Sequence, residues 1–151
     1  MATEASRILL VDGNTEGLAS LAYALEALDP RLELLQAASA ATAHQQLSAE
    51  ALPFLLLVAE ELPDSPGHQL LEELHGQHPQ LVKVLYSPRG KDELRGEILR
   101  AHLSAGLFAF IPRKWLFESL GELLDCARDR YAGRSVRLRP EFKRHARFWV
   151  D

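Results

Sequence analysis

The chain has 151 residues, of which 47% are hydrophobic and 25% are charged, and its formal net charge is −4. This composition is typical of one globular domain and is too apolar for a disordered chain. The longest nearly continuous apolar run, residues 52–59, is far shorter than the roughly 20 residues of a membrane-spanning helix, and residues 1–7 lack the apolar core of a secretory signal. The single cysteine, Cys126, excludes an internal disulfide, and we expect it to be a small core residue. We therefore expect a cytoplasmic protein without a membrane span.

The negative charge is unevenly distributed along the chain. Residues 133–151 contain six Lys or Arg side chains against Glu141 and Asp151, so the remaining residues carry a formal charge of −8. This shift in composition predicts a domain over residues 1–132 and a basic C-terminal extension over residues 133–151. Basic segments that contain aromatic residues also occur in nucleic-acid-binding proteins, but we favour a solvated extension over a nucleic-acid contact.

Short apolar runs alternate with longer amphipathic segments over residues 6–131. The predicted strands cover residues 7–12, 32–38, 54–59, 81–86 and 106–111. The predicted helices lie between residues 14 and 29, 39 and 47, 67 and 78, 91 and 103, and 115 and 131, with Asn14 and Ser39 as N-caps and Gly133 after the last helix. The first run is apolar enough to be buried on both faces, as parallel strands are, and the five strands alternate with five helices through short connections. This pattern predicts an α/β domain with a doubly wound, five-stranded parallel sheet and helices on both faces.

Several residues at fixed spacing resemble landmarks of the receiver domains of two-component response regulators. Residues 8–12 are similar to the family's first strand and its acidic end, and Leu62-Pro63 with Gly67 are similar to the loop after the third strand. Tyr86-Ser87 match a hydroxyl position on the fourth strand, and residues 105–111 match the fifth strand. The resemblance covers about residues 6–131. It implies the flavodoxin-like (βα)5 fold of that family and a role in signal transduction.

In that family, a histidine kinase transfers a phosphoryl group to an aspartate at the end of the third strand. The aspartate lies four residues before the loop proline and eight before the loop glycine. Counting back from Pro63 and from Gly67 gives Ala59 in both cases, and a methyl group has no lone pair that could accept the phosphoryl group. Glu60 and Glu61 follow directly, but the alternation of a strand points Glu60 away from the face of Ala59.

The residues that support the acceptor in the family are also changed. A receiver places two adjacent acids after the first strand, which hold Mg²⁺ together with the acceptor aspartate, but here Gly13 follows Asp12. The family's lysine is replaced by Arg113, and Ser87 alone retains its expected type. One carboxylate instead of three leaves too few oxygen ligands for Mg²⁺. We therefore predict no metal and no other cofactor at this pocket, and an ion pair between Asp12 and Arg113.

These changes predict a degenerate receiver, or pseudo-receiver, that is not an enzyme and acts by binding another protein. Its degenerate phosphoacceptor pocket consists of Asp12, Gly13, Ala59, Ser87 and Arg113. Two alternatives stay open: a receiver still phosphorylated at Glu60 or Glu61, and a nucleic-acid-binding regulator that uses the basic extension. We expect Ser87 to cap its loop, and we expect the six histidines on the solvated surface rather than at a metal.

The resemblance also implies where a partner binds, because the fourth helix, fifth strand and fifth helix form the usual output and dimer face of the family. In this chain, that face would include Arg95, Arg100, Phe110, Trp115, Glu118 and Glu122. The expected partner is a signalling protein or a second copy of the chain. Trp115 is either an anchor for that partner or a packing residue at the start of the last helix, and the sequence leaves both roles open.

Overall fold

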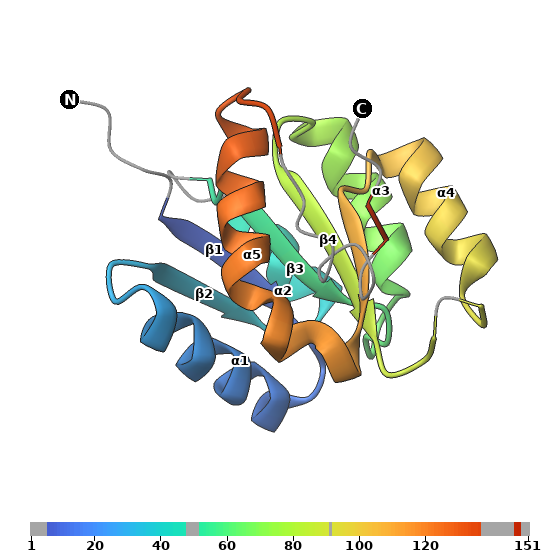
Figure 1. The fold of residues 1–151 in the computed structure, drawn as a ribbon. Coiled ribbons are helices and arrows are strands. Elements are labelled where there is room, and N and C mark those ends of the chain that lie inside the picture. Colours follow the sequence, from blue (N-terminus) through green and yellow to red (C-terminus); the bar gives the residue numbers. More distant parts are fainter. Residues whose placement is uncertain (1–5, 48–51, 91, 137–146, 149–151) are drawn as a thin grey trace.

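The computed structural model describes residues 6–47, 52–90 and 92–136, together with the backbone of residues 147–148. One sheet runs through it in the order β2-β1-β3-β4-β5-β6 (Figure 1). The strands are β1 (Arg7–Val11), β2 (Glu33–Ala37), β3 (Leu55–Ala59), β4 (Val82–Ser87), β5 (Ala109–Pro112) and β6 (Arg147–Phe148). The first five pair in parallel, which confirms the predicted five-stranded parallel sheet.

Helices cover both faces of the sheet, so the doubly wound α/β architecture is confirmed (Figure 1). Helices α1 (Thr15–Leu28) and α5 (Arg113–Tyr131) pack on one face, and α2 (Ala40–Leu47), α3 (Gly67–Gln77) and α4 (Arg95–Ala105) pack on the other. Among the described residues, no helix combines the length and the apolar character needed to cross a bilayer.

The buried strands supply side chains to both faces in alternation. In β3, Leu55, Leu57 and Ala59 join the core under α1 and α5, whereas Leu56 and Val58 join the core under α2, α3 and α4. Every residue of β3 is buried, as the continuous apolar run predicts. This alternation decides which residues after β3 and β4 face the pocket described below.

Polar caps hold the helix starts near the carboxyl edge of the sheet. The side-chain oxygens of Asn14 and Ser39 accept hydrogen bonds from backbone N–H groups in the first turns of α1 and α2, at 3.1 and 3.2 Å, and both caps were predicted. Asp64, which sequence reasoning missed, accepts hydrogen bonds from the N–H groups of Ala40 and Ala41. These two bonds stabilise the carboxylate and lower the pKa of Asp64.

The C-terminal segment adds a strand that the sequence did not predict. Strand β6 pairs antiparallel with β5, with Ala109 opposite Phe148 and Phe110 opposite Arg147. The predicted basic extension therefore returns to the sheet at residues 147–148. Its residues 137–146 and 149–151 lie outside the described part of the chain.

Candidate functional site

The residues of the predicted pocket lie at one edge of the sheet, where the carboxyl ends of β1, β3 and β4 meet. Asp12 follows β1, Ala59 ends β3, Ser87 ends β4, and Arg113 begins α5. The strands are parallel and α5 starts directly after β5, so the fold gathers residues that are far apart in sequence. The structure thus brings the predicted pocket residues to one edge.

Asp12 is a buried carboxylate whose two oxygens already have donors. Its Oδ2 accepts a hydrogen bond from the Tyr86 hydroxyl at 2.8 Å, and its Oδ1 accepts one from the backbone N–H of Asn14 at 2.9 Å. The guanidinium of Arg113 lies 3.5 Å from Oδ2, so the expected ion pair is present. Burial and the negative charge of Asp12 raise the pKa of Tyr86, which keeps its hydroxyl a donor.

Tyr86 is the pocket residue that sequence reasoning did not assign. It pairs in register with Ala59 of β3, and both side chains join the core under α1 and α5. The sequence contained a signal for it, because alternation along β4 places residues 82, 84 and 86 on one face. A tyrosine there brings its hydroxyl to the buried carboxylate of Asp12.

The space around Asp12 does not fit a magnesium site. A Cβ atom on Gly13 would lie 3.0 Å from Cδ of Pro63, so a side chain at this position would require the proline ring to move by a few tenths of an ångström. A Cβ atom on Gly17 would lie 2.9 Å from Nη2 of Arg113, which shows that the guanidinium lies against the start of α1. Within the described ranges, no group of three or more potential metal-ligating side chains occurs. The residues present therefore do not fit Mg²⁺, which needs several oxygen ligands.

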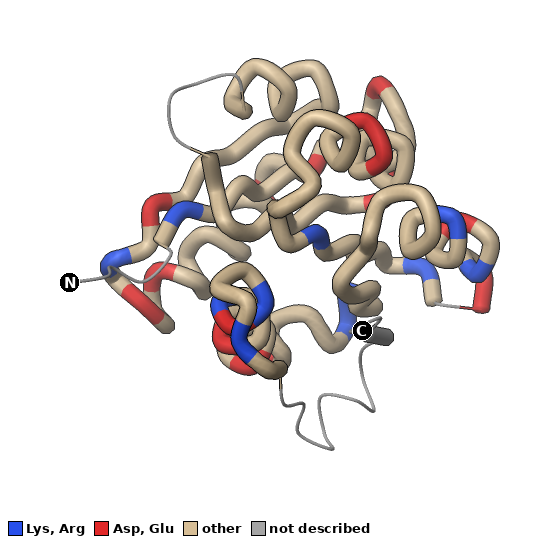
Figure 2. The backbone as a smooth tube through the Cα atoms, turned by 90° about the horizontal axis from the view of Figure 1, so that it is seen from above, with Lys and Arg blue, Asp and Glu red and all other residues tan. Residues whose placement is uncertain are grey.

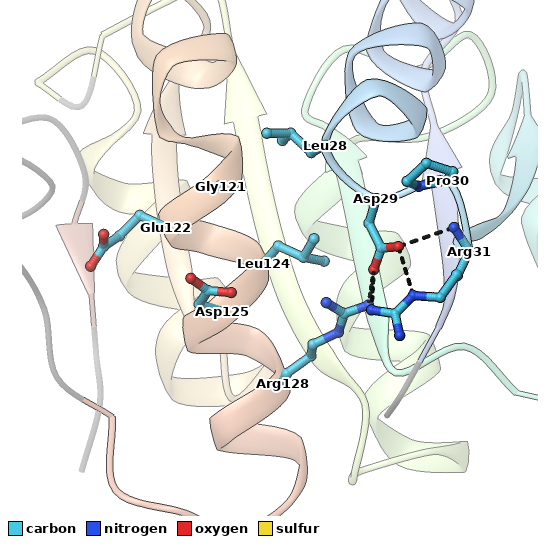
Figure 3. A pocket seen from close by; sticks show the side chains of 9 residues that line it. All are labelled: Leu28, Asp29, Pro30, Arg31, Gly121, Glu122, Leu124, Asp125 and Arg128. Carbon is cyan, nitrogen blue, oxygen red and sulfur yellow. Dashed lines mark hydrogen bonds and ion pairs between the residues drawn. The ribbon is translucent and has the colours of Figure 1, made fainter. Parts of the chain in front are cut away.

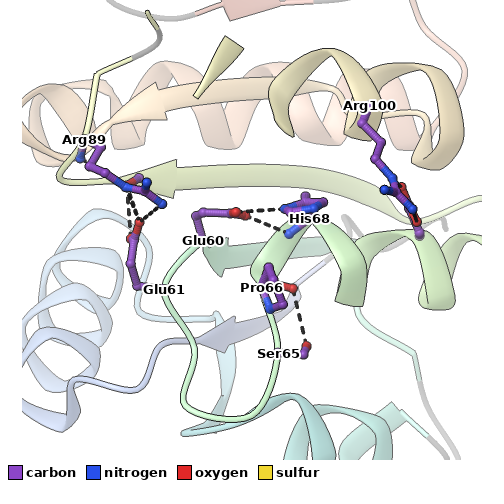
Figure 4. A network of polar contacts seen from close by, with 9 residues as sticks. Glu60, Glu61, Ser65, Pro66, His68, Arg89 and Arg100 are labelled. Atoms are coloured by element: carbon purple, nitrogen blue, oxygen red, sulfur yellow. Dashed lines mark hydrogen bonds and ion pairs between the residues drawn. The ribbon is translucent and has the colours of Figure 1, made fainter. Parts of the chain in front are cut away.

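Glu60 directs its carboxylate toward His68 at the start of α3 (Figure 4). The carboxylate is buried and accepts a hydrogen bond from the backbone N–H of His68 at 2.9 Å, and its second oxygen lies 2.8 Å from Nδ1 of the same residue. This arrangement agrees with the predicted direction of Glu60. It corrects the expectation that the histidines are all solvated, because His68 is mostly buried beside Glu60.

Glu61 forms a separate network with Ser87 and Arg89, and Figure 4 shows Glu61 beside Arg89. The fully buried Ser87 hydroxyl donates to the Glu61 carboxylate, with O–O distances of 2.8 and 3.0 Å, and accepts a hydrogen bond from the backbone N–H of Arg89 at 3.0 Å. The guanidinium of Arg89 completes the network 3.0 Å from Glu61, and this contact raises the pKa of Arg89. Ser87 therefore caps its loop, as predicted.

The predicted interaction face needs one correction. Phe110 is fully buried in the core under α3 and α4, so its side chain presents no surface to a partner. A β-strand residue flanked by helices on both faces is buried whichever way it points, which the family resemblance did not consider. Trp115 is partly buried against the core under α1 and α5, which favours the packing role among the two left open.

The other residues of the predicted interaction face differ in their exposure and in the ion pairs that they form within the chain. Arg100 pairs with Glu72 of α3 at 2.6 Å, so it links two helices of the same chain. Arg95, in contrast, is 81% exposed and pairs with the similarly exposed Asp92 three residues before it. Glu118 is exposed and Glu122 half-buried. Leu99, Leu103 and Phe117 also lie exposed on α4 and α5, although sequence reasoning did not single them out as surface residues.

A second feature lies at the opposite end of α5. A groove of about 640 Å³ separates the C-terminal end of α1 from α5 (Figure 3). Within it, the Asp29 carboxylate accepts hydrogen bonds from the guanidinium groups of Arg31 and Arg128. This buried ion pair ties α1 to α5, and we treat it as a structural element of the fold.

We expect Asp12→Ala to lower the free energy of unfolding by about 1–3 kcal/mol, because it removes the partner of the buried Tyr86 hydroxyl. Chemical denaturation of this variant and of the control Glu16→Ala, an exposed acid in the first turn of α1, would measure the difference. Millimolar Mg²⁺ should leave the melting temperature of the natural chain unchanged. A clear rise with Mg²⁺ would contradict this assignment.

No protein-family model matches this chain, and no curated protein matches it at a significant level. Solved structures do match it. A signal receiver domain of an HD domain-containing protein from Pseudomonas fluorescens Pf-5 is 25% identical, with a TM-score of 0.77 over 88% of this chain and 93% of that chain. A response regulator receiver domain protein (CheY-like) from Methanospirillum hungatei JF-1 is 27% identical, with a TM-score of 0.72 over 85% and 97%. NtrX from Brucella abortus is also 27% identical, with a TM-score of 0.71 over 85% of this chain and 28% of NtrX.

The similarity to these solved structures indicates the fold of the chain and its general role. The chain has the CheY-like fold of receiver domains, and the similarity to receiver domains supports a regulatory module in signalling. The match extends over nearly all of the described domain and therefore does not depend on one motif. Whether the pocket performs the family's chemistry depends on the residues described above.

Proposed function

We propose that the protein is a phosphorylation-independent pseudo-receiver that acts in signal transduction by binding other proteins. The observation that carries this proposal is Ala59 at the end of β3, in register with Tyr86 and without an acceptor atom. The neighbouring Asp12 pairs with Arg113 and accepts a hydrogen bond from Tyr86, so the one carboxylate of the pocket is already bound within the chain.

The two acids nearest to Ala59 support the same conclusion. Glu60 caps α3 through His68, and Glu61 bonds to Ser87 and Arg89. For either acid to act as an acceptor, it would have to leave these partners. Breaking the hydrogen bonds of a buried carboxylate such as that of Glu60 destabilises the folded state. This favours the pseudo-receiver over a receiver with a displaced phosphorylation site.

Ser87 further supports independence from phosphorylation. Its hydroxyl already donates to a carboxylate that belongs to the chain itself, that of Glu61. The orientation of the hydroxyl and of the loop around Arg89 is therefore stabilised without a phosphoryl group. A module with this pocket is constitutive, and its activity is set by binding.

The interaction face in this proposal is the surface formed by α4, β5 and α5, which we call the α4–α5 face. Its exposed apolar side chains are Leu99 and Leu103 on α4 and Phe117 on α5, and the same two helices carry exposed charges such as Arg95 and Glu118. Apolar anchors provide most of the affinity of a protein interface, and surrounding charges mainly set orientation and association rate. The partner is a second copy of the chain or another signalling protein.

We expect self-association through the α4–α5 face, weakened at least about tenfold by Leu103→Asp, because the change places a charge among the apolar anchors. Tyr23→Asp is the matched control: Tyr23 on α1 is 77% exposed and Leu103 is 73% exposed. Sedimentation velocity at several concentrations measures both. Equal weakening by the two variants would contradict this face, and a strictly monomeric natural chain at high concentration would contradict the homodimer.

A further inference from the structure

The groove between α1 and α5 shares no residue with the pocket around Asp12 (Figure 3). Its walls are the C-terminal end of α1, the turn that follows α1, and one side of α5. Its volume of about 640 Å³ lies within the range of about 300–1,000 Å³ that is typical of ligand-binding clefts. The groove is therefore large enough to hold a side chain of another molecule.

Gly121 contributes open space to this groove. It lies within α5, and a Cβ atom there would lie 3.9 Å from Cδ2 of Leu28, which is an ordinary van der Waals distance. Among the described residues, only Gly106 and Gly133 have a positive φ, so the backbone at Gly121 does not require glycine. Glycine weakens a helix relative to alanine, so the stability of α5 does not explain its presence. Its effect is to leave space beside Leu28 into which a partner's side chain can fit.

Part of the lining of the groove is apolar. Leu28 is 51% exposed, Pro30 is also exposed, and Leu124 adds a buried apolar side chain. An apolar group that covers Leu28 and Pro30 removes apolar surface from water, which favours binding. The groove therefore suits a ligand that has an aliphatic part.

The charged residues of the groove are not balanced. Asp29 accepts hydrogen bonds from Arg31 and Arg128, so these three side chains already bind one another (Figure 3). Glu122 and Asp125 of α5 also line the groove, so its lining contains three acids against two bases and has a formal charge of −1. Within the described part of the chain, the exposed carboxylate of Asp125 forms no hydrogen bond or ion pair. This lining favours a cation over an anion.

The acidic character of the groove continues along α5. Acidic residues recur on one side of the helix at intervals of four, three and four residues: Glu118, Glu122, Asp125 and Asp129. Figure 2 shows acidic positions gathered along α5, seen end-on beneath the sheet. Residues 1–132 together carry a formal charge of −8. A negative field of this kind raises the rate at which a basic partner associates, and salt weakens the attraction.

We propose that this groove binds an arginine or lysine side chain of a partner protein, together with an apolar residue beside it in that partner. The aliphatic stem of the basic side chain lies over Leu28 and Gly121, and its charged end pairs with Glu122 and Asp125. This inference goes beyond the proposed function and does not depend on it, because it uses neither the pocket around Asp12 nor the exposed apolar side chains of the α4–α5 face.

The test uses the full chain and two capped pentapeptides, Ala-Leu-Arg-Leu-Ala and Ala-Leu-Glu-Leu-Ala, which differ only in the central residue. Titration followed by the NMR chemical shifts of the backbone amides locates the binding site and gives Kd. We expect the arginine peptide to bind with a Kd of about 1 mM or tighter and to shift the amides of Leu28, Gly121 and Asp125. The glutamate peptide should bind at least about tenfold more weakly.

Gly121→Val fills the open space and should weaken binding of the arginine peptide at least about tenfold. Gly96→Val is the matched control, because Gly96 also lies in a helix, α4, and a Cβ atom there would have no neighbouring group within 4 Å. This control should bind the peptide as the natural chain does. Melting curves of both variants report whether they are folded.

A second variant, Glu122→Gln with Asp125→Asn, removes the two charges and retains the size of both side chains. It should weaken binding of the arginine peptide about threefold or more, since an exposed ion pair contributes about 0.2–1 kcal/mol. Its control is Glu16→Gln with Glu93→Gln, which removes the same charge at exposed acids that do not line the groove. The control should bind as the natural chain does.

Three results would overturn the proposal: no saturable binding of the arginine peptide, equal affinity for the two peptides, or equal affinity of Gly121→Val and Gly96→Val for the arginine peptide. Equal effects of the two double variants would overturn the pairing of the cation with Glu122 and Asp125.

Discussion

Replacing Arg128 by alanine should lower the free energy of unfolding by about 2–4 kcal/mol. The guanidinium of Arg128 lies 2.8 Å from the Asp29 carboxylate and 5.7 Å from the centre of the Phe54 ring, and its side chain is buried between α1 and α5. Its removal takes away a buried ion pair, a cation–π contact and packing at once. Urea denaturation at neutral pH measures the loss.

Arg31→Ala is the matched control for this prediction, because Arg31 binds the same carboxylate but is 76% exposed. Exposed ion pairs contribute only about 0–1 kcal/mol, so this variant should remain close to the natural chain. Equal losses in the two variants would contradict the structural role that we assign to Arg128.

The pH dependence of the Arg128 effect follows from Asp29. Hydrogen bonds from Arg31 and then Arg128 lower the pKa of Asp29 below its ordinary value of 3.8. A carboxyl group whose pKa is lower in the folded state stabilises the fold above its unfolded pKa, and this contribution is lost as pH falls through the folded pKa. The difference between the natural chain and Arg128→Ala should therefore shrink as the pH falls below 3.8.

Replacing Lys83 by methionine should raise the free energy of unfolding at pH 7 by about 2 kcal/mol. Lys83 lies on β4, faces the core under α3 and α4, and is 1% exposed. Its ammonium donates to the carbonyl oxygens of Leu81 at 2.9 Å and Pro79 at 3.5 Å, and no carboxylate pairs with it in the described contacts. Burial without a counter-ion lowers the pKa of Lys83 to about 8. Methionine removes the cost of the buried charge but also loses the two hydrogen bonds.

The lowered pKa of Lys83 gives a second test, because it makes the free energy of unfolding depend on pH. The folded chain loses the Lys83 proton near pH 8, whereas the unfolded chain retains it up to about pH 10.5. Because the unfolded state binds more protons in this interval, stability should rise as pH increases from 8 to 10.5 in the natural chain relative to Lys83→Met. Lys114→Met, at an exposed lysine of α5, serves as the control. A flat difference between the natural chain and Lys83→Met over this interval would contradict the assignment.

The apolar runs predicted the parallel sheet because the central strands β1, β3 and β4 are buried on both faces, and β3 shows this most directly. The position of Ala59 was also predictable, since two independent landmarks, Pro63 and Gly67, count back to it. Contacts between residues distant in sequence were not predictable from local pattern. The Asp64 cap on α2 spans 24 and 23 residues, and the Tyr86–Asp12 hydrogen bond spans 74.

Two other features that the sequence did not predict also depend on contacts between segments that are distant in the chain. Phe110 is apolar and lies on the strand of the predicted face, but only the packing of α3 and α4 shows that it is buried. Strand β6 has two residues, too few for an alternating pattern, and its position depends on the uncovered edge of β5. Sequence periodicity identifies elements that are long and buried, whereas short edge strands depend on the fold around them.

The central claim is that this receiver fold has no acceptor for a phosphoryl group, and intact-mass spectrometry after incubation with acetyl phosphate and Mg²⁺ tests it most directly. A receiver domain with the acceptor aspartate, treated in parallel, shows that the reagent is active. We predict that the mass of this chain stays unchanged. A gain of one phosphoryl group that disappears in Glu60→Gln or Glu61→Gln would contradict the account and would identify a displaced phosphorylation site.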